Sequence, residues 1–530
     1  MIGGVLALAA GLVVAVAPTA AADDTLTDLG PVPSNRNDIV VAGDKVVVSL
    51  DDRIVFTDRK GEVEETITDV SGAHGLIATA DGTRVYAALS GSGEVAEIDI
   101  ATREIARRIN LSDYGCPYDL ALTGDRLWVA YSCGERGVLG LDLSTPESEP
   151  VNVDTSLLKA GPLIAAAGDT LVLGETLSPA DLFVYDVSGA APVLRGEIDG
   201  HAHDHHGLDD VAVTPDGSYI ISAFTLPDAF SMWDAVTLTK VRDYQKGPEA
   251  EGYPRSVAIS PDGAYIAGGR TLGFGMTVYD RASGAELFTA NPPKGEVARG
   301  SSAYAGRDIY SLVQADERIY LWRLHDVTLP ESSLTLTAEP GATVHVPFTM
   351  TGRLTFPDGT APGAQPLIVT RTAGDGTTET LPGVTTAEDG TYTITDTPPA
   401  GGQTTYTVLW DGDGKRRWSK ASVTMMVRYQ AVLTLNGPAT AVAGTTLLLW
   451  GSLEAVGTDR PENVWISMER TRKSDGQTVT GNIYQGGIGT FTFRDSPEPG
   501  EYTYTLRWPG DSRTGPAEAS HTVIIEAPAG

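Results

Sequence analysis

The chain has 530 residues, more than one hydrophobic core can organise, so several domains are expected. Its formal net charge of −31 at pH 7 argues against nucleic acid or an anionic membrane surface as a partner, because phosphate binding needs a basic face. Sixty glycines and 32 prolines, with only 20% charged residues, favour short strands and turns over long helices.

Residues 1–22 have the pattern of a secretory signal peptide. An uncharged apolar run from Ile2 to Ala17 is followed by small residues, and cleavage is predicted after Ala22, directly before Asp23. The run is also near the lower length limit for a membrane span, so an uncleaved anchor is the alternative. Cleavage is the prediction, and it gives a secreted protein without a membrane span.

A turn motif recurs along residues 37–328. Apolar runs flank Pro-Asp-Gly at 215–217 and at 261–263, and looser glycine-containing versions lie near positions 43, 81, 124, 168 and 306. Proline and glycine at these places turn the chain back, so the flanking runs form hairpins. Seven turns at a period of about 44 residues, with about four apolar runs in each period, predict a seven-bladed β-propeller.

The last repeat, Ser301 to Leu324, is short of a fourth strand. The N-terminal segment 23–36 is expected to complete this blade through Thr25–Gly30 and so to close the ring.

The only two cysteines, Cys116 and Cys133, flank the turn of the third repeat at Gly124-Asp125. Pairing counted outward from this turn places Cys116 opposite Cys133, and Tyr118 opposite Tyr131. A disulfide is therefore predicted for an exported protein, and two free thiols are the alternative.

Four of the eight histidines fall in one short segment, which joins the predicted fourth and fifth blades and is expected to overhang the mouth of the channel. Imidazole and carboxylate groups at this density suit Zn, Ni or Cu. The alternative is a solvated loop that binds metal incidentally. The candidate metal ligands are His201, His203, His205, His206 and Asp209.

Aligning the repeats on their turns places one residue of each repeat at a common level of the channel. A ring that contains imidazole, phenol, carboxylate and guanidinium groups is able to bind a polar ligand. The alternative is a water-filled rim. The aligned residues are Asn37, His74, Tyr118, Pro162, Asp209, Arg255 and Gly300, and the candidate ligand-binding residues are His74, Tyr118, Asp209 and Arg255.

From residue 331 the pattern changes to threonine and valine alternating with apolar residues, with turns at roughly 8–12-residue spacing, which is typical of immunoglobulin-like sandwiches. The region also repeats itself, since Trp410 and its surroundings match Trp508 and its surroundings. Two sandwich domains are predicted, residues 331–428 and 429–527.

The two Pro-Asp-Gly turns at 215–217 and 261–263 and the tail motif from Gly390-Thr391-Tyr392 to Gly402 resemble secreted actinobacterial Ig-like domain repeat proteins with a YVTN-like seven-bladed propeller. The resemblance covers nearly the whole mature chain and implies export and fold, but no assigned reaction. Similar seven-bladed propellers include lactonases and streptogramin lyases, which use polar channel residues and a divalent metal.

No Ser-His-Asp spacing, phosphate loop or nucleophile elbow occurs in the sequence. The leading hypothesis is a secreted, non-catalytic, monomeric binding protein, whose channel face recognises an extracellular protein, a cell-wall glycan or a small polar ligand. The sandwich domains then serve as spacers or adhesion modules. The alternative is a metal-dependent, lactonase- or lyase-like enzyme that uses the histidine segment, and a structural role in the cell envelope ranks third.

Overall fold

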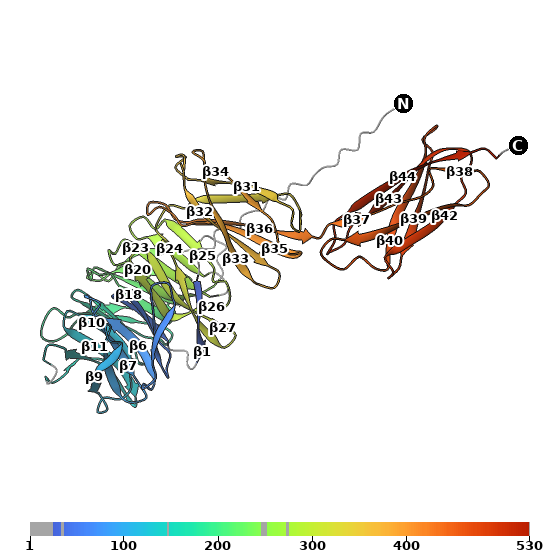
Figure 1. Ribbon diagram of the computed structural model, residues 1–530. Helices are drawn as coiled ribbons and strands as arrows, with labels where there is room; N and C mark the ends of the chain where they lie inside the picture. The colour runs from blue at the N-terminus through green and yellow to red at the C-terminus, as the bar shows by residue number, and fades with distance from the viewer. Residues whose placement is uncertain (1–24, 33–36, 146–147, 245–251, 272–274, 529–530) are drawn as a thin grey trace. The chain divides into compact units, whose positions relative to one another are not determined.

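The computed structural model describes residues 25–32, 37–145, 148–244, 252–271 and 275–528, and the predicted signal peptide lies outside them (Figure 1). All regular secondary structure in these residues is β, which confirms the all-β prediction. The described part of the chain contains no helix that meets the length and hydropathy needed to cross a membrane. It forms two compact units, which divide between Leu329 and Pro330.

The first unit consists of seven four-stranded antiparallel sheets in the described residues. In six of them the chain runs through four consecutive strands as a meander, and in the seventh the order is β1-β28-β27-β26. The first three sheets are β2 (Asp38–Ala42), β3 (Lys45–Ser49), β4 (Ile54–Thr57), β5 (Val63–Ile67); β6 (Ala73–Ala78), β7 (Arg84–Leu89), β8 (Glu94–Asp99), β9 (Glu104–Asn110); and β10 (Pro117–Thr123), β11 (Arg126–Cys133), β12 (Glu135–Asp142), β13 (Val151–Asn152).

The other four sheets follow the same plan. They are β14 (Leu163–Ala167), β15 (Thr170–Gly174), β16 (Leu182–Asp186), β17 (Val193–Ile198); β18 (His206–Val213), β19 (Tyr219–Leu226), β20 (Phe230–Asp234), β21 (Lys240–Tyr244); β22 (Pro254–Ile259), β23 (Tyr265–Arg270), β24 (Met276–Asp280), β25 (Glu286–Ala290); and β26 (Glu296–Ala305), β27 (Asp308–Ala315), β28 (Arg318–Leu324), β1 (Thr25–Pro31).

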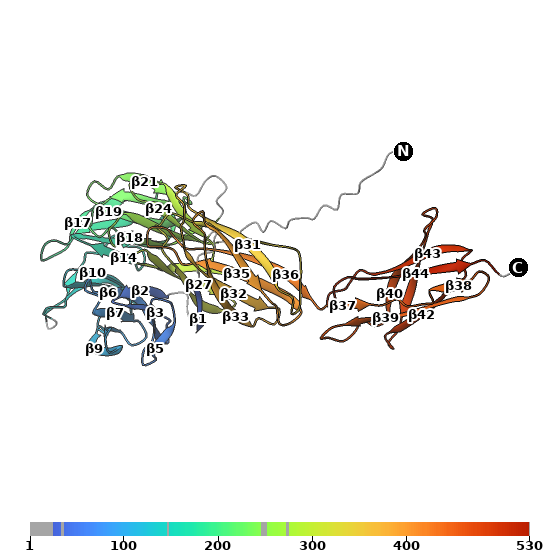
Figure 2. The same ribbon diagram turned by 45° about the horizontal axis from the view of Figure 1, so that its top comes forward.

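The first strands of the repeats contact one another in the order β2, β6, β10, β14, β18, β22, β26, and β26 contacts β2, so the ring closes. In Figure 2 the labelled outer strands β5, β9, β17 and β21 lie at the edge of this unit, and β2, β6, β10, β14 and β18 lie toward its centre. This arrangement is a β-propeller. β1 pairs with β28, so the outer strand of the last sheet comes from the segment that contains Thr25–Gly30.

The Pro-Asp-Gly turns form for a local reason. In the turn between β18 and β19 the Asp216 carboxylate accepts a hydrogen bond from the Thr214 hydroxyl at 2.6 Å and one from the Ser218 amide at 3.1 Å. Gly217 has φ +71°, a conformation that costs glycine little. The turn before β23 repeats these contacts around Asp262. These turns set the register of the inner hairpins.

The hydrophobic core of this unit lies between adjacent sheets. One cluster, for example, joins Val47 and Phe56 of the first sheet to Val85 and Ile98 of the second, and all four side chains are buried. Burial of such a side chain contributes about 1.5–3 kcal/mol, so the contacts between blades hold the ring together.

Cys116 and Cys133 form a disulfide with a Cα–Cα distance of 5.2 Å, which confirms the predicted bond. The predicted register is wrong at the end of this hairpin, because Tyr131 faces Pro117 and not Tyr118. A β-bulge between Pro117 and Asp119 takes up one extra residue. Cys116 is therefore displaced by one position, and its carbonyl accepts from the Ser132 amide.

The second unit contains two β-sandwiches, each made of a three-stranded and a five-stranded sheet with the same strand order in both copies (Figure 1). The first has β29 (Ser333–Ala338), β31 (Phe348–Thr355), β34 (Thr391–Asp396) facing β30 (Ala342–Thr343), β36 (Ser419–Arg428), β35 (Gly402–Trp410), β32 (Pro366–Ala373), β33 (Thr378–Thr385). The second has β37 (Ala431–Leu433), β39 (Leu447–Ala455), β42 (Thr490–Asp495) facing β38 (Thr440–Val442), β44 (Ala517–Glu526), β43 (Gly500–Trp508), β40 (Val464–Arg472), β41 (Thr478–Gln485).

The two sandwiches repeat one another down to individual contacts. Each core buries a tryptophan, Trp410 or Trp508, and combines side chains from both sheets. Each copy also holds an arginine and a tyrosine on one aspartate. These trios are Arg371, Tyr406 and Asp396 in the first copy and Arg470, Tyr504 and Asp495 in the second.

Candidate ligand site in the propeller channel

The inner strands of the propeller leave a cavity of about 1130 Å³ in the channel. The structure brings all four candidate ligand-binding side chains to this cavity, each from a different inner strand. Pro162 is replaced in the lining by its neighbours Gly161 and Leu163. The aligned residues that line the cavity are Asn37, His74, Tyr118, Asp209, Arg255 and Gly300.

Asp209 at the cavity wall lies between two arginines. Its carboxylate oxygens lie 3.1 Å from Arg255 Nη1 and 3.2 Å from Arg299 Nη2. The Asp209 side chain is only 3% exposed, whereas that of Arg299 is 57% exposed. Burial raises the pKa of Asp209, and the two guanidinium groups oppose that shift. The cluster therefore presents cationic donors toward the open channel.

Sequence reasoning missed Arg299. β26 is irregular between Val297 and Ser302, where its pairing with β27 shifts, so the alignment on turns placed Gly300 in the ring instead. The only signal available in the sequence was an arginine directly before the aligned position.

A second set of acidic residues follows one position further along alternate inner strands. Each carboxylate accepts one hydrogen bond from the next amide of its own strand and one from an amide of the following inner strand, at distances of 2.7–2.9 Å. Each thereby ties two neighbouring sheets together. The three residues are Asp38, bonded to Leu76; Asp119, bonded to Ile164; and Asp210, bonded to Val257.

These carboxyl groups are enclosed by the channel. Burial raises the pKa of Asp38 to about 7 and holds the pKa of Asp210 well above its usual range. Their role is structural, because they accept hydrogen bonds from backbone amides of the inner strands.

Tyr118 is held in place by the next sheet. Its hydroxyl donates to the Pro162 carbonyl at 2.5 Å, and a Cβ added at Gly161 would lie 2.8 Å from that hydroxyl oxygen. The absence of a side chain at Gly161 therefore leaves room for the Tyr118 ring to reach the segment before β14. Tyr118 is the extra residue of the bulge between Pro117 and Asp119.

The histidine segment does not form the predicted metal site. Asp209 is bound to arginines in the channel, and none of residues 201–206, all of which are described, lines the cavity. The loop was expected to overhang the channel, but it contributes no residue to the cavity lining. His206 Nε2 lies 3.2 Å from Asp204, and His205 is fully buried. The predicted ligands His201, His203, His205, His206 and Asp209 are not gathered around one point.

Aromatic packing explains this outcome. The His205 ring stacks on Phe224 at 4.0 Å between centroids, meets the edge of Trp233 at 5.3 Å, and is covered by His203 at 5.4 Å. Neither ring nitrogen of His205 has a hydrogen-bond partner in the described structure. His205 therefore behaves as an apolar ring, and burial, followed by the charges of His203 and Lys240, lowers its pKa to about 4.

One other cluster, Asp308, His325 and Asp326, brings three potential metal ligands together in the described residues. His325 Nδ1 lies 2.7 Å from Asp308 and its Nε2 lies 3.4 Å from Asp326, and the hydrogen bond to Asp308 raises the pKa of His325. A protonated imidazole has no lone pair for a metal, and Arg323 also binds Asp308 at 2.9 Å. This cluster is a network of ion pairs.

Replacing His205 with phenylalanine is expected to protect the propeller against acid. In the folded protein His205 stays neutral to about pH 4, whereas in the unfolded chain it gains a proton below about pH 6.5, so the wild type loses stability as pH falls between these values. At pH 5 the loss amounts to about 2 kcal/mol. Urea unfolding at pH 7.5 and pH 5 measures the free energy of unfolding of both proteins. Between these two pH values the stability of the variant relative to the wild type should rise by this amount. If the difference in free energy of unfolding between the variant and the wild type is the same at both pH values, His205 is not a buried neutral imidazole.

No protein-family model matches the chain, and no curated protein sequence matches it. Similar solved structures include the β-propeller domain of Cps50 (Swd1) from Myceliophteria thermophila, with 15% identity and a TM-score of 0.43, covering 56% of this chain and 99% of that one. Kuenenia stuttgartiensis hydrazine synthase has 17% identity and a TM-score of 0.45, covering 56% of this chain and 95% of that one. These likenesses carry no argument about function.

Proposed function

We propose that the protein is a secreted, non-catalytic binding protein. In this proposal its seven-bladed β-propeller recognises an extracellular or cell-envelope ligand at the channel, and the two immunoglobulin-like sandwiches, residues 331–428 and 429–527, act as spacer or adhesion modules. The observation that carries the proposal is the Arg255–Asp209–Arg299 cluster in the wall of a cavity of about 1130 Å³.

The cluster is suited to binding because it is held in place before a ligand arrives. Asp209 fixes both guanidinium groups, and each guanidinium has five N–H donors, of which the carboxylate uses only part. A ligand oxygen that meets Arg299 therefore gains a charge-assisted hydrogen bond without first ordering the side chain.

The rest of the lining indicates what kind of ligand fits. Acidic side chains at Glu296, Asp316 and Glu317 share the cavity with the two arginines. Electrostatic complementarity then favours a small ligand that carries both acidic and basic or amide groups. Peptides and peptide-bearing cell-wall fragments have this chemistry.

The metal-dependent enzyme is the weaker candidate. It needed the histidine segment at the channel mouth, whereas His205 packs among aromatic rings and residues 201–206 lie outside the cavity lining. The binding function requires no such segment.

The proposal is tested by titrating the full chain with muramyl dipeptide and with short peptides that contain both lysine and glutamate. At least one probe is expected to bind, and Arg299→Ala is expected to weaken it about 10- to 100-fold, the equivalent of one hydrogen bond to a charged group. Arg136→Ala, which removes an exposed arginine from β12, is the matched control and should leave the affinity unchanged. No binding by any probe, or equal binding by both variants, would contradict a ligand site at Arg299.

A further inference from the structure

Two exposed aromatic rings stand side by side on the outer face of the second sandwich. Trp465 on β40 and Tyr484 on β41 are direct cross-strand partners, and their ring centroids lie 5.1 Å apart. Trp465 is 62% exposed and Tyr484 is 47% exposed. Exposing two large rings in water costs free energy, so a paired exposure of this kind marks a binding surface.

A row of polar side chains runs beside these rings across four strands. Glu518 on β44 faces Arg507 on β43, Arg507 faces Ser467 on β40, and Ser467 faces Asn482 on β41. Arg507 Nε donates to Glu518 at 2.9 Å, and Ser467 Oγ donates to the Arg507 carbonyl at 3.0 Å. Four strands at about 4.8 Å spacing make this row roughly 14 Å long.

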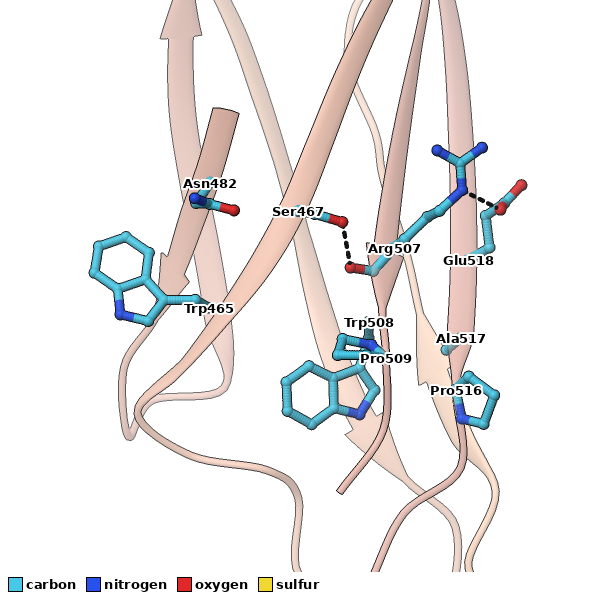
Figure 3. A pocket seen from close by; sticks show the side chains of 9 residues that line it. All are labelled: Trp465, Ser467, Asn482, Arg507, Trp508, Pro509, Pro516, Ala517 and Glu518. Carbon is cyan, nitrogen blue, oxygen red and sulfur yellow. Dashed lines mark hydrogen bonds and ion pairs between the residues drawn. The ribbon is translucent and has the colours of Figure 1, made fainter. Parts of the chain in front are cut away.

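The Trp465 ring and the polar row border one open cleft of about 760 Å³, and Tyr484 lies beside it as the cross-strand partner of Trp465. Figure 3 shows the Trp465 ring on one side of β40, the Arg507–Glu518 pair on the other, and the rings of Trp508, Pro509 and Pro516 along one end. The cleft thus has flat apolar surfaces and hydrogen-bonding groups within reach of the same ligand.

The Tyr484 ring is fixed in orientation, and the Trp465 ring packs against it. The Tyr484 hydroxyl donates to Asn463 Oδ1 at 2.8 Å, and the residues that follow Trp465 and precede Tyr484 in sequence, Ile466 and Ile483, are buried in the core. Stacking of a ligand on these rings therefore costs little side-chain entropy.

The first sandwich provides an internal comparison, because it has the same strand order, and β32, β35 and β36 pair in the same register as β40, β43 and β44. The position of Trp465 is taken there by Pro366, that of Ser467 by Ile368, that of Arg507 by Leu409, and that of Glu518 by Lys420. The fold does not require the aromatic and polar rows, since its other copy lacks them. They belong to the second copy alone.

We propose that this surface, the Trp465 platform (Trp465, Ser467, Asn482, Tyr484, Arg507 and Glu518), binds a neutral oligosaccharide. The C–H groups on a sugar ring face carry partial positive charge and suit the negative face of an aromatic ring. Asn482 and Arg507 offer donors, and Asn482 and Glu518 offer acceptors, so both functions of a sugar hydroxyl are met. This gives a ligand class to the proposed adhesion role of the sandwiches and uses no residue of the channel.

Charge and hydrogen bonding separate this ligand from its competitors. Arg507 is paired with Glu518 at 2.9 Å and also lies 3.9 Å from Glu469, so the platform has no net positive charge to attract an acidic polysaccharide. A proline-rich peptide also stacks on aromatic rings, but it offers carbonyl acceptors with few donors, so the acceptor oxygens of Asn482 and Glu518 would gain no hydrogen bond from it.

The test is calorimetric titration of the full chain with cellohexaose, chitohexaose and maltohexaose, with decaproline as the competing probe. At least one hexasaccharide should bind, and Trp465→Ala and Tyr484→Ala should each weaken it at least 10-fold. The matched control is Trp450→Ala, which removes an exposed tryptophan from β39 in the other sheet and should change the affinity less than twofold. Since Trp465 and Tyr484 are exposed, unchanged melting temperatures are expected to show that the variants are folded.

The outcomes also separate this proposal from that for the channel. Arg299→Ala should bind the hexasaccharide as the wild type does. The proposal is overturned if no hexasaccharide binds, if binding survives Trp465→Ala, or if decaproline alone binds through Trp465. Sugar binding that is lost in Arg299→Ala but kept in Trp465→Ala would also overturn it, and would support the channel as the glycan site.

Discussion

Replacing Asp228 with alanine is expected to lower the free energy of unfolding of the propeller by about 3 kcal/mol, because it leaves a buried charge without its partner. The partner is Arg270 on β23, whose side chain is only 1% exposed. Arg270 donates to the Asp228 carboxylate and to the Gly252 carbonyl, and its guanidinium lies 5.0 Å from the centre of the Phe230 ring. The value is at the lower end of the range for buried pairs because Asp228 is itself partly exposed.

The double variant Asp228→Ala, Arg270→Met is the control for this interpretation. Methionine fills much of the arginine volume without a charge, so the double variant should recover part of the stability that the single variant loses. Urea unfolding of the full chain, followed through the propeller transition, measures both. A loss below about 1 kcal/mol for Asp228→Ala, the level of an exposed salt bridge, would contradict a buried pair at this place.

Removing the disulfide is expected to cost a similar amount, about 3 kcal/mol, through the greater freedom of the unfolded chain. The bond links residues 17 positions apart in sequence, at the bulged end of the hairpin from which Tyr118 enters the channel. The variant for this test is Cys116→Ser, Cys133→Ser, which leaves no unpaired thiol. Its melting temperature should fall well below that of the wild type.

Two measurements control the disulfide prediction. Thiol titration of the denatured, unreduced wild type should find essentially no free thiol, since the structure has no free cysteine in its described residues. A reducing agent should destabilise the wild type as much as the double serine variant and should leave that variant unchanged. Two titratable thiols, or equal melting temperatures, would contradict the bond.

The propeller could be predicted from the sequence because its signals are local and repeated. Turns such as Thr214 to Ser218 satisfy their own polar groups within five residues, so the same motif gives the same hairpin wherever it occurs. Counting from these turns also placed His74, Tyr118, Asp209 and Arg255 in one cavity, since each inner strand begins at a similar distance from its turn.

What the sequence could not supply depends on contacts between distant segments. The bulge before Asp119 shifts the register of its hairpin by one residue, and the irregular pairing of β26 places Arg299 beside Asp209. Neither irregularity has a marker in the local sequence. His205 has the same side chain as the exposed His203, but Phe224 and Trp233 from two later strands decide that it is buried. A cluster of histidines therefore predicts metal binding only where no aromatic neighbours compete for the rings.

The Trp465 platform shows the same limit in the second unit. Its polar row takes one residue from each of four strands, so Glu518 and Asn482 become neighbours of one surface only when the sheet is assembled. In the sequence these residues are unremarkable polar positions. The sequence does reveal that the sandwiches are duplicated. Comparing the two copies shows that the platform residues are replaced in the first copy by Pro366, Ile368, Leu409 and Lys420.

The most direct test of the proposed channel function is a crystal structure of the full chain with the tightest-binding peptide or muramyl peptide probe. The proposal predicts that the probe lies in the cavity lined by His74, Tyr118 and Arg255, with an acidic or carbonyl oxygen within hydrogen-bond distance of Arg255 or Arg299. A probe bound elsewhere on the protein, with the channel filled only by water, would contradict it.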